Sequence, residues 1–228
     1  MPFFDDSGVR TEEHRGPLLS AFAVLFDQIE RMVVLNVAWA VQLVPLLAAL
    51  AFPELPLGVR VPLVAYSVLA LAPATGALFG LVARACDGEL LRLETVREVL
   101  REVARPSLVT LMPLYSLFVW LALLAGWAAG RQLLVLDVLA RLLILLLGVC
   151  AVYWGPLFAA RPAQSALAVL RESVRLAWRF PLLTVLAGMA SLLAAALGLI
   201  SVGGMVLVVP VLVVLLQTQQ YRHVKRET

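Results

Sequence analysis

Long apolar runs, separated by short charged segments, make up most of this chain. A helix needs about 20 apolar residues to cross roughly 30 Å of hydrocarbon. Four runs of that length cover residues 32–52, 61–83, 107–129 and 139–158. Only 14% of the residues are charged, whereas about 25% are charged in an average soluble domain. The sequence therefore predicts an integral membrane protein that lies in the lipid bilayer.

The stretch 182–216 contains 35 residues without an ionisable side chain. As one helix it would be about 52 Å long, too long for one crossing and long enough for two short ones. The sequence Ser201-Val202-Gly203-Gly204 supplies a break, because glycine accepts the positive φ of a tight turn. We therefore predict spans five and six at 181–200 and 204–220.

The predicted fold is an all-α, polytopic membrane helical bundle with about six transmembrane helices. A segment at 1–31 precedes the six-span domain at 32–220, and a short tail follows at 221–228. Lys and Arg are concentrated in four segments, because 15 of the 18 lie within 1–31, 84–106, 161–179 and 221–228. Such an excess marks the cytoplasmic side. We expect a multi-pass protein of the plasma (inner) membrane with both termini cytoplasmic and no nucleic-acid partner.

Three of the cytoplasmic segments have the periodicity of amphipathic helices. Their predicted apolar faces consist of Leu18, Phe22, Leu25, Phe26 and Ile29; of Val96, Val99, Leu100 and Val103; and of Leu167, Leu170, Val174 and Trp178. The second segment also has the spacing for i,i+3 charge pairs, namely Glu94/Arg97, Glu98/Arg101 and Glu102/Arg105.

Six arginines on the second and third of these helices are candidates for docking: Arg97, Arg101, Arg105, Arg171, Arg175 and Arg179. One interpretation is that the helices lie in the headgroup layer, where arginines meet anionic lipid. The other is that they dock a membrane transport partner protein. The periodicity is typical of any interfacial helix and therefore favours the first.

The same two segments resemble each other at an offset of 74 residues. The first reads Arg97-Glu98-x-x-Arg101-x-x-x-Arg105-x-x-Leu108-x-Thr110, and the second reads Arg171-Glu172-x-x-Arg175-x-x-x-Arg179-x-x-Leu182-x-Thr184. Upstream, Gly76-x-Leu78-Phe79 matches Gly155-x-Leu157-Phe158 at an offset of 79. A parallel repeat of this kind occurs in transporter folds, whose sites lie at the repeat interface. Chance likeness between two basic amphipathic helices is the alternative.

Candidate substrate-contact or packing residues lie in the first two spans: Asn36, Trp39, Gln42, Pro73, Ala74 and Thr75. Proline removes a backbone hydrogen bond, so Pro73-Ala74-Thr75-Gly76 is predicted to be the most disrupted stretch of a span. A broken helix there would contribute to a substrate site, whereas a kink would only allow close packing. Asn36 is expected to bond between helices, and Asp137 and Arg141 are expected to form an i,i+4 pair.

Enzyme signatures are missing from the sequence. Its histidines, His14 and His223, lie in the terminal segments, and no Cys/His cluster has the spacing of a metal site. No span supplies a base beside a nucleophile. We predict no catalytic residue, no metal and no cofactor.

Several motifs resemble the YesL-like family of bacterial membrane proteins. They are Asn36-x-x-Trp39, then Leu71-Ala72-Pro73-Ala74-Thr75-Gly76-Ala77-Leu78-Phe79, then Arg84 and Gly88-Glu89. The resemblance covers about the first 120 residues and implies a small multi-span protein associated with carbohydrate uptake. It lends no catalytic residue.

The predicted function is thus a non-enzymatic accessory or permease-like component of carbohydrate uptake. The alternative is a structural or regulatory membrane protein with no substrate path. A cavity lined by Asn36, Gln42 or Thr75 would favour the first. The sequence leaves a homo-oligomer open.

Overall fold

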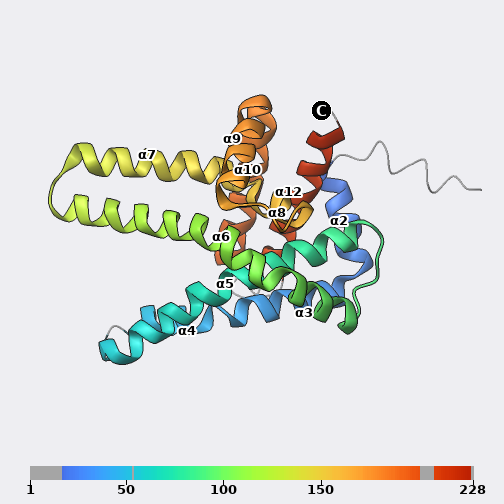
Figure 1. Cartoon of the computed structure of the whole chain (residues 1–228), viewed down its shortest axis with the longest axis horizontal. Coiled ribbons are helices and arrows are strands. Elements are labelled where there is room, and N and C mark those ends of the chain that lie inside the picture. Colours follow the sequence, from blue (N-terminus) through green and yellow to red (C-terminus); the bar gives the residue numbers. More distant parts are fainter. Residues whose placement is uncertain (1–16, 53, 201–207, 227–228) are drawn as a thin grey trace, which may run out of the picture.

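The computed structural model describes residues 17–52, 54–200 and 208–226, and within these ranges every regular element is a helix (Figure 1). In chain order the helices are α2 (Pro17–Asp27), α3 (Ile29–Val41), α4 (Val44–Ala51), α5 (Leu57–Cys86), α6 (Leu93–Gly130), α7 (Leu134–Ala151), α8 (Trp154–Ala160), α9 (Ala166–Arg179), α10 (Pro181–Ile200) and α12 (Val209–Arg226). The predicted all-α class is confirmed for these residues.

Four helical segments are long and apolar enough to cross a membrane: Ile29–Ala49, Leu57–Cys86, Leu93–Gly130 and Leu134–Ala151. A fifth candidate is the pair α9 and α10, which is bent by 108°. The chain is therefore a candidate multi-pass membrane protein with four to five spans among the described residues. The predicted break at 201–204 and the start of the sixth span at 204 lie outside them.

The surfaces of α7 and α10 are strongly apolar. More than half of the surface of each of these leucines is exposed: Leu142, Leu145, Leu146, Leu182, Leu192 and Leu193. An apolar surface of this extent is rare on soluble monomers, whereas lipid covers it without cost. This surface supports contact with a lipid bilayer.

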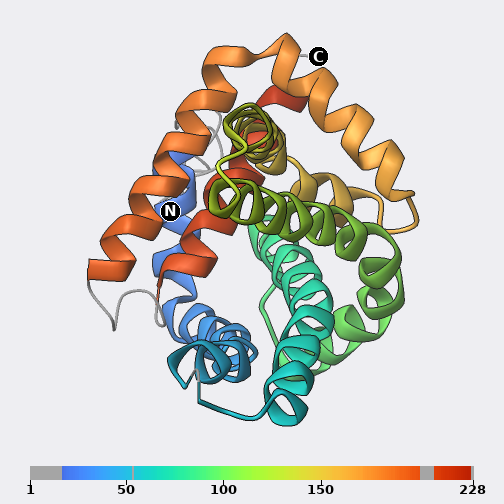
Figure 2. The same cartoon turned by 90° about the vertical axis from the view of Figure 1, so that its left-hand side faces the viewer.

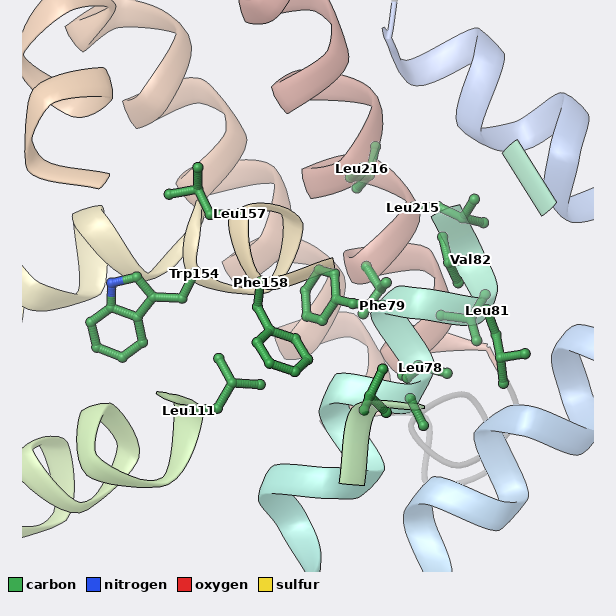
Figure 3. Close-up of a cluster of buried hydrophobic side chains, with 14 of the residues drawn as sticks. Leu78, Phe79, Leu81, Val82, Leu111, Trp154, Leu157, Phe158, Leu215 and Leu216 are labelled. Carbon is green, nitrogen blue, oxygen red and sulfur yellow. The ribbon is translucent and has the colours of Figure 1, made fainter. Parts of the chain in front are cut away.

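The helices do not share one direction. The antiparallel helices α6 and α7 project together as a long hairpin, while α10 and α12 pack on each other and run across that hairpin (Figures 1 and 2). Helices α5, α8 and α12 meet in a core, whose buried side chains include Leu81, Phe158 and Leu215 (Figure 3).

Proline positions explain several boundaries. Pro45 and Pro156 lie in the first turns of α4 and α8, where a missing N–H leaves no intrahelical bond unmade. The predicted span 32–52 is thus divided between α3 and α4, and the predicted span 139–158 ends with α7 at Ala151.

The predicted disruption at Pro73 is wrong, because α5 stays helical from Leu57 to Cys86 through Pro62 and Pro73. Each proline removes one N–H donor, and the remaining bonds of a 30-residue helix hold it together. Similarly, α6 continues through Pro106 and Pro113, so the predicted cytoplasmic helix and the span 107–129 form one helix of 38 residues.

Only part of the predicted apolar face of the N-terminal helix is buried in the protein. Leu25 is buried, but Phe26 and Ile29 are exposed, and the side chains of residues 18 and 22 lie outside the described set. The buried face instead carries Ala21, Leu25, Gln28 and Met32, and α2 packs on α12. Helix α12 therefore covers a face that shares Leu25 with the predicted one, while Phe26 and Ile29 stay exposed, as residues toward a membrane surface would.

Candidate functional site

Two glycines and two phenylalanines pack reciprocally where α5 meets α8. A Cβ atom added to Gly76 would lie 2.9 Å from Cε1 of Phe158, and one added to Gly155 would overlap the ring of Phe79. Each ring therefore occupies space that only a glycine leaves free. Figure 3 shows the two rings side by side in the core. We call Gly76, Phe79, Gly155 and Phe158 the Gly–Phe interlock.

The interlock joins the two copies of the Gly-x-Leu-Phe motif, with the phenylalanine of each copy on the glycine of the other. The arginine-rich parts of the repeat do not share one conformation. Residues 97–110 lie within the continuous helix α6, whereas residues 171–184 are interrupted at Phe180 between α9 and α10. The two motif copies thus contact each other reciprocally at the interlock, whereas the arginine-rich parts of the repeat differ in conformation.

A cavity of about 300 Å³ lies beside the interlock, which contributes Phe79 and Gly155 to its wall. We call it the inner cavity. Its other lining residues are Trp39, Thr75, Leu78, Tyr115, Ala151, Val209, Pro210, Val213, Val214 and Gln217. Two of the candidate residues, Trp39 and Thr75, therefore reach one cavity from different helices.

The polar groups of the inner cavity are few and defined. Nε1 of Trp39 donates to Oγ1 of Thr75 at 3.1 Å and fixes the indole against α5. The hydroxyl of Tyr115 and the amide of Gln217 belong to α6 and α12, so four helices bring a polar side chain to the wall. Sequence reasoning missed Tyr115 and Gln217, because only the fold brings them to the first two spans.

Asn36 has a structural role. Its side chain is fully buried, and its Oδ1 accepts from the backbone N–H of Val211 at 2.7 Å. Val211 lies in the first turn of α12, where backbone N–H groups have no intrahelical acceptor. Asn36 thus joins α3 to the start of α12 and does not line the inner cavity.

Replacing Asn36 with alanine should lower the free energy of unfolding by about 1–3 kcal/mol, because it leaves a buried N–H without its acceptor. Reversible unfolding in mixed micelles measures the change. The matched control is Gln42→Ala, since Gln42 is partly exposed and bonds the hydroxyl of Tyr66 at the surface. Equal losses in both variants would contradict the capping role.

A second, smaller cavity of about 180 Å³ brings other candidates together. Gln42 and Ala74 line it with Trp39, whose indole therefore borders both cavities. Pro73 lines neither cavity. Of the six candidates in the first two spans, four thus reach a cavity, while Asn36 and Pro73 do not.

The predicted charge pairs along α6 are wrong. Glu98 and Glu102 pair instead with Arg84 at the end of α5, at 3.1 and 3.4 Å, and Glu89 lies 3.7 Å from the same guanidinium. Arg84 faces α6 across the α5–α6 contact and therefore collects three carboxylates. The predicted pair of Asp137 and Arg141 is confirmed, with a distance of 2.7 Å.

The six candidate docking arginines are all exposed. Arg97, Arg101 and Arg105 lie on α6, and Arg171, Arg175 and Arg179 lie on α9. Helix α9 buries Val169, Ser173 and Leu176 and leaves an apolar stripe outside, in which Trp178 is 88% exposed. An exposed tryptophan among arginines is the composition of a helix at a membrane interface.

Among the described residues no group of three or more His, Cys, Asp or Glu side chains could hold a metal ion. Cys86 and Cys150 are free thiols.

Comparison with protein-family models, curated proteins and solved structures finds no match for this chain. The resemblance to the YesL-like family therefore stays a prediction, and what can be concluded from the fold is a chain with four to five candidate membrane spans.

Proposed function

We propose that this chain is a non-enzymatic, accessory or permease-like component of carbohydrate uptake, as its resemblance to the YesL-like family implies. The observation that carries the proposal is the inner cavity, which lies at the interlock of the two motif copies and includes Trp39 and Thr75. In transporter folds built from repeats, solute sites lie at such an interface.

The lining of the inner cavity suits a small solute with apolar and polar faces. The rings of Trp39, Phe79 and Tyr115 offer flat surfaces, and the amide of Gln217 offers hydrogen-bonding groups, while Oγ1 of Thr75 already accepts from Trp39. A largely apolar cleft with a few placed polar groups is the usual form of a small-molecule site. A sugar ring has apolar C–H faces, which stack on aromatic rings, and hydroxyl groups, which bond polar side chains.

The proposed topology has both termini on the cytoplasmic side of the inner membrane. Contacts between predicted cytoplasmic segments support it. Gln28 bonds the backbone of Glu89 and Leu91 at 3.2 Å, and Arg222 pairs with Asp87 at 2.8 Å. The N-terminal segment, the 84–106 loop and the tail therefore meet at one end of α5.

Energy for uptake would come from another protein. In the candidate span Leu93–Gly130 the carboxylates, Glu94, Glu98 and Glu102, all lie in the first ten residues, and the apolar part from 103 to 130 contains no carboxylate for proton coupling. The exposed arginines of α6 and α9 are the surface proposed for such a transport partner or for anionic lipid.

Substituting the cavity wall tests this function. In cells that depend on the protein for uptake of a carbohydrate, Thr75→Leu should lower the initial rate of uptake at least tenfold, because the larger side chain fills the cavity. Gln217→Leu tests the opposite wall independently. The lipid-facing variant Leu145→Ala is the control, and membrane-inserted protein is quantified for each. Deletion that leaves uptake of every tested carbohydrate unchanged would contradict the proposal.

A structural or regulatory membrane protein without a substrate path is the second candidate. Two observations favour it, because Asn36 is used as a helix partner and most residues around the inner cavity are apolar. Purification in gentle detergent separates the two functions. A transport protein retained in stoichiometric amount supports the accessory role, whereas a chain that elutes alone or as a homo-oligomer removes the reason for a partner.

A further inference from the structure

A separate pocket of about 570 Å³ lies where the end of α5 and helix α8 meet the C-terminal half of α12. We call it the basic pocket. Helix α12 contributes Thr218, Tyr221, Arg222, Lys225 and Arg226, which recur at the spacing of one helix face. The opposite wall consists of Ala83 and Asp87 from the end of α5 and of Pro156, Ala159 and Ala160 from α8. It shares no lining residue with the inner cavity.

Arg222 is fixed in place. Its guanidinium donates to the carbonyl oxygens of Ala83 and Cys86 at 2.9 and 3.1 Å, and it pairs with Asp87 at 2.8 Å. The carbonyl of Ala83 also accepts from the backbone N–H of Asp87 at 3.2 Å, whereas Cys86 is the last residue of α5, where a carbonyl lacks an intrahelical donor. Arg222 therefore holds α12 against α5, and its charge is largely balanced by Asp87.

Lys225 and Arg226 have no ion-pair partner among the described residues. Both are exposed. Burial raises the pKa of Tyr221 in the same wall, while the nearby charge of Arg161 lowers it and that of Glu172 raises it. The pocket and its surroundings thus hold four cationic side chains, namely Arg161, Arg222, Lys225 and Arg226. Two carboxylates, those of Asp87 and Glu172, lie near them.

Thr218 supplies an unsatisfied polar group in the wall. Its side chain is 4% exposed, and its Oγ1 has no hydrogen-bond partner. A buried hydroxyl without a partner costs free energy that a bound acceptor would recover. Thr218 lies one turn before Arg222 and two turns before Lys225 and Arg226, so the hydroxyl and the cations line the same wall of the pocket.

We propose that the basic pocket binds a phosphate group. Phosphate oxygens accept hydrogen bonds from hydroxyl, ammonium and guanidinium donors, which are the groups that face this pocket. The apolar wall formed by Ala83, Pro156 and Ala159 adds a surface for the carbon skeleton that carries the phosphate. That skeleton can belong to an anionic lipid, since basic pockets between membrane helices hold lipid headgroups, or the ligand can be a free phosphate.

Two binding measurements on the full-length protein in detergent distinguish these sources. Native mass spectrometry measures retention of phosphatidylglycerol against diacylglycerol, which has the same glycerol backbone and no phosphate, and equilibrium dialysis measures binding of inorganic phosphate. The test variant is Lys225→Gln/Arg226→Gln, and Thr218→Val removes the hydroxyl with little change in shape. The charge-matched control is Arg92→Gln/Arg131→Gln, which removes two exposed arginines from the two ends of α6, outside the proposed docking surface.

The site predicts that the double variant of α12 loses about tenfold or more in affinity for the phosphate-bearing ligand, while the α6 control keeps wild-type affinity. Thr218→Val should lose about threefold or more. Selective loss of phosphatidylglycerol would support a lipid ligand, and selective loss of inorganic phosphate would support a soluble one. Equal losses in the α12 and α6 variants, or no phosphate-dependent binding by the wild type, would overturn the proposal.

Discussion

Replacing Phe158 with alanine should lower the free energy of unfolding by about 3 kcal/mol. The Phe158 ring is fully buried and fills the space above Gly76, so its removal leaves a cavity in the core between α5 and α8. The expected value lies at the low end for Phe→Ala substitutions. When the protein unfolds within a micelle, the Phe158 ring moves from the protein core into lipid, so it loses packing contacts but little hydrophobic free energy. Reversible unfolding in mixed micelles, followed by circular dichroism, measures the change.

The control for this substitution is Phe52→Ala. The side chain of Phe52 is 62% exposed at the end of α4, so its removal should change the free energy of unfolding by less than about 0.5 kcal/mol. Similar losses in both variants would show that the ring of Phe158 does not pack as the interlock requires.

Adding a single methyl group at Gly155 should also destabilise the protein. The new Cβ of Gly155→Ala would overlap the Phe79 ring, which is 5% exposed and would have to leave its packed position toward the inner cavity that it lines. Overpacking of this kind costs about 1–3 kcal/mol, more than the gain of up to about 1 kcal/mol when alanine replaces glycine in a helix. The midpoint of thermal unfolding should therefore fall.

Gly126→Ala is the matched control, because nothing lies within 4 Å of a Cβ added to Gly126 in α6. It should leave stability unchanged or raise it slightly. The pair Gly155→Ala and Phe79→Leu should recover part of the loss, since leucine leaves room for the methyl group. If Gly155→Ala and Gly126→Ala behave alike, the reciprocal packing is incorrect.

Local features of the fold could be predicted from the sequence. The fifth predicted span, 181–200, coincides with α10, and the spacing of Asp137 and Arg141 correctly predicts their ion pair. Both depend on short-range patterns, namely the length of an apolar run and one turn of helix. Pro73 shows the limit of such reasoning, because a helix with many intact bonds tolerates a proline that the local rule treats as a break.

Contacts between distant segments could not be predicted. The sequence shows two Gly-x-Leu-Phe motifs, but their packing on each other depends on how α5 meets α8. Likewise, the carboxylates of Glu98 and Glu102 have arginines three residues away, yet they bond Arg84 from another helix. Periodicity along one helix cannot reveal a partner that the tertiary fold supplies.

If the inner cavity is a solute path, position 75 is accessible from water, and labelling of a cysteine there tests this directly. Thr75→Cys is made in a background in which Cys86 and Cys150 are replaced by alanine, so that it carries the only thiol. We expect that a small, water-soluble thiol reagent labels this cysteine in membranes, and that a transported carbohydrate slows the labelling. A cysteine that stays unlabelled, while one at exposed Arg131 reacts, would contradict a solute path and leave the structural function.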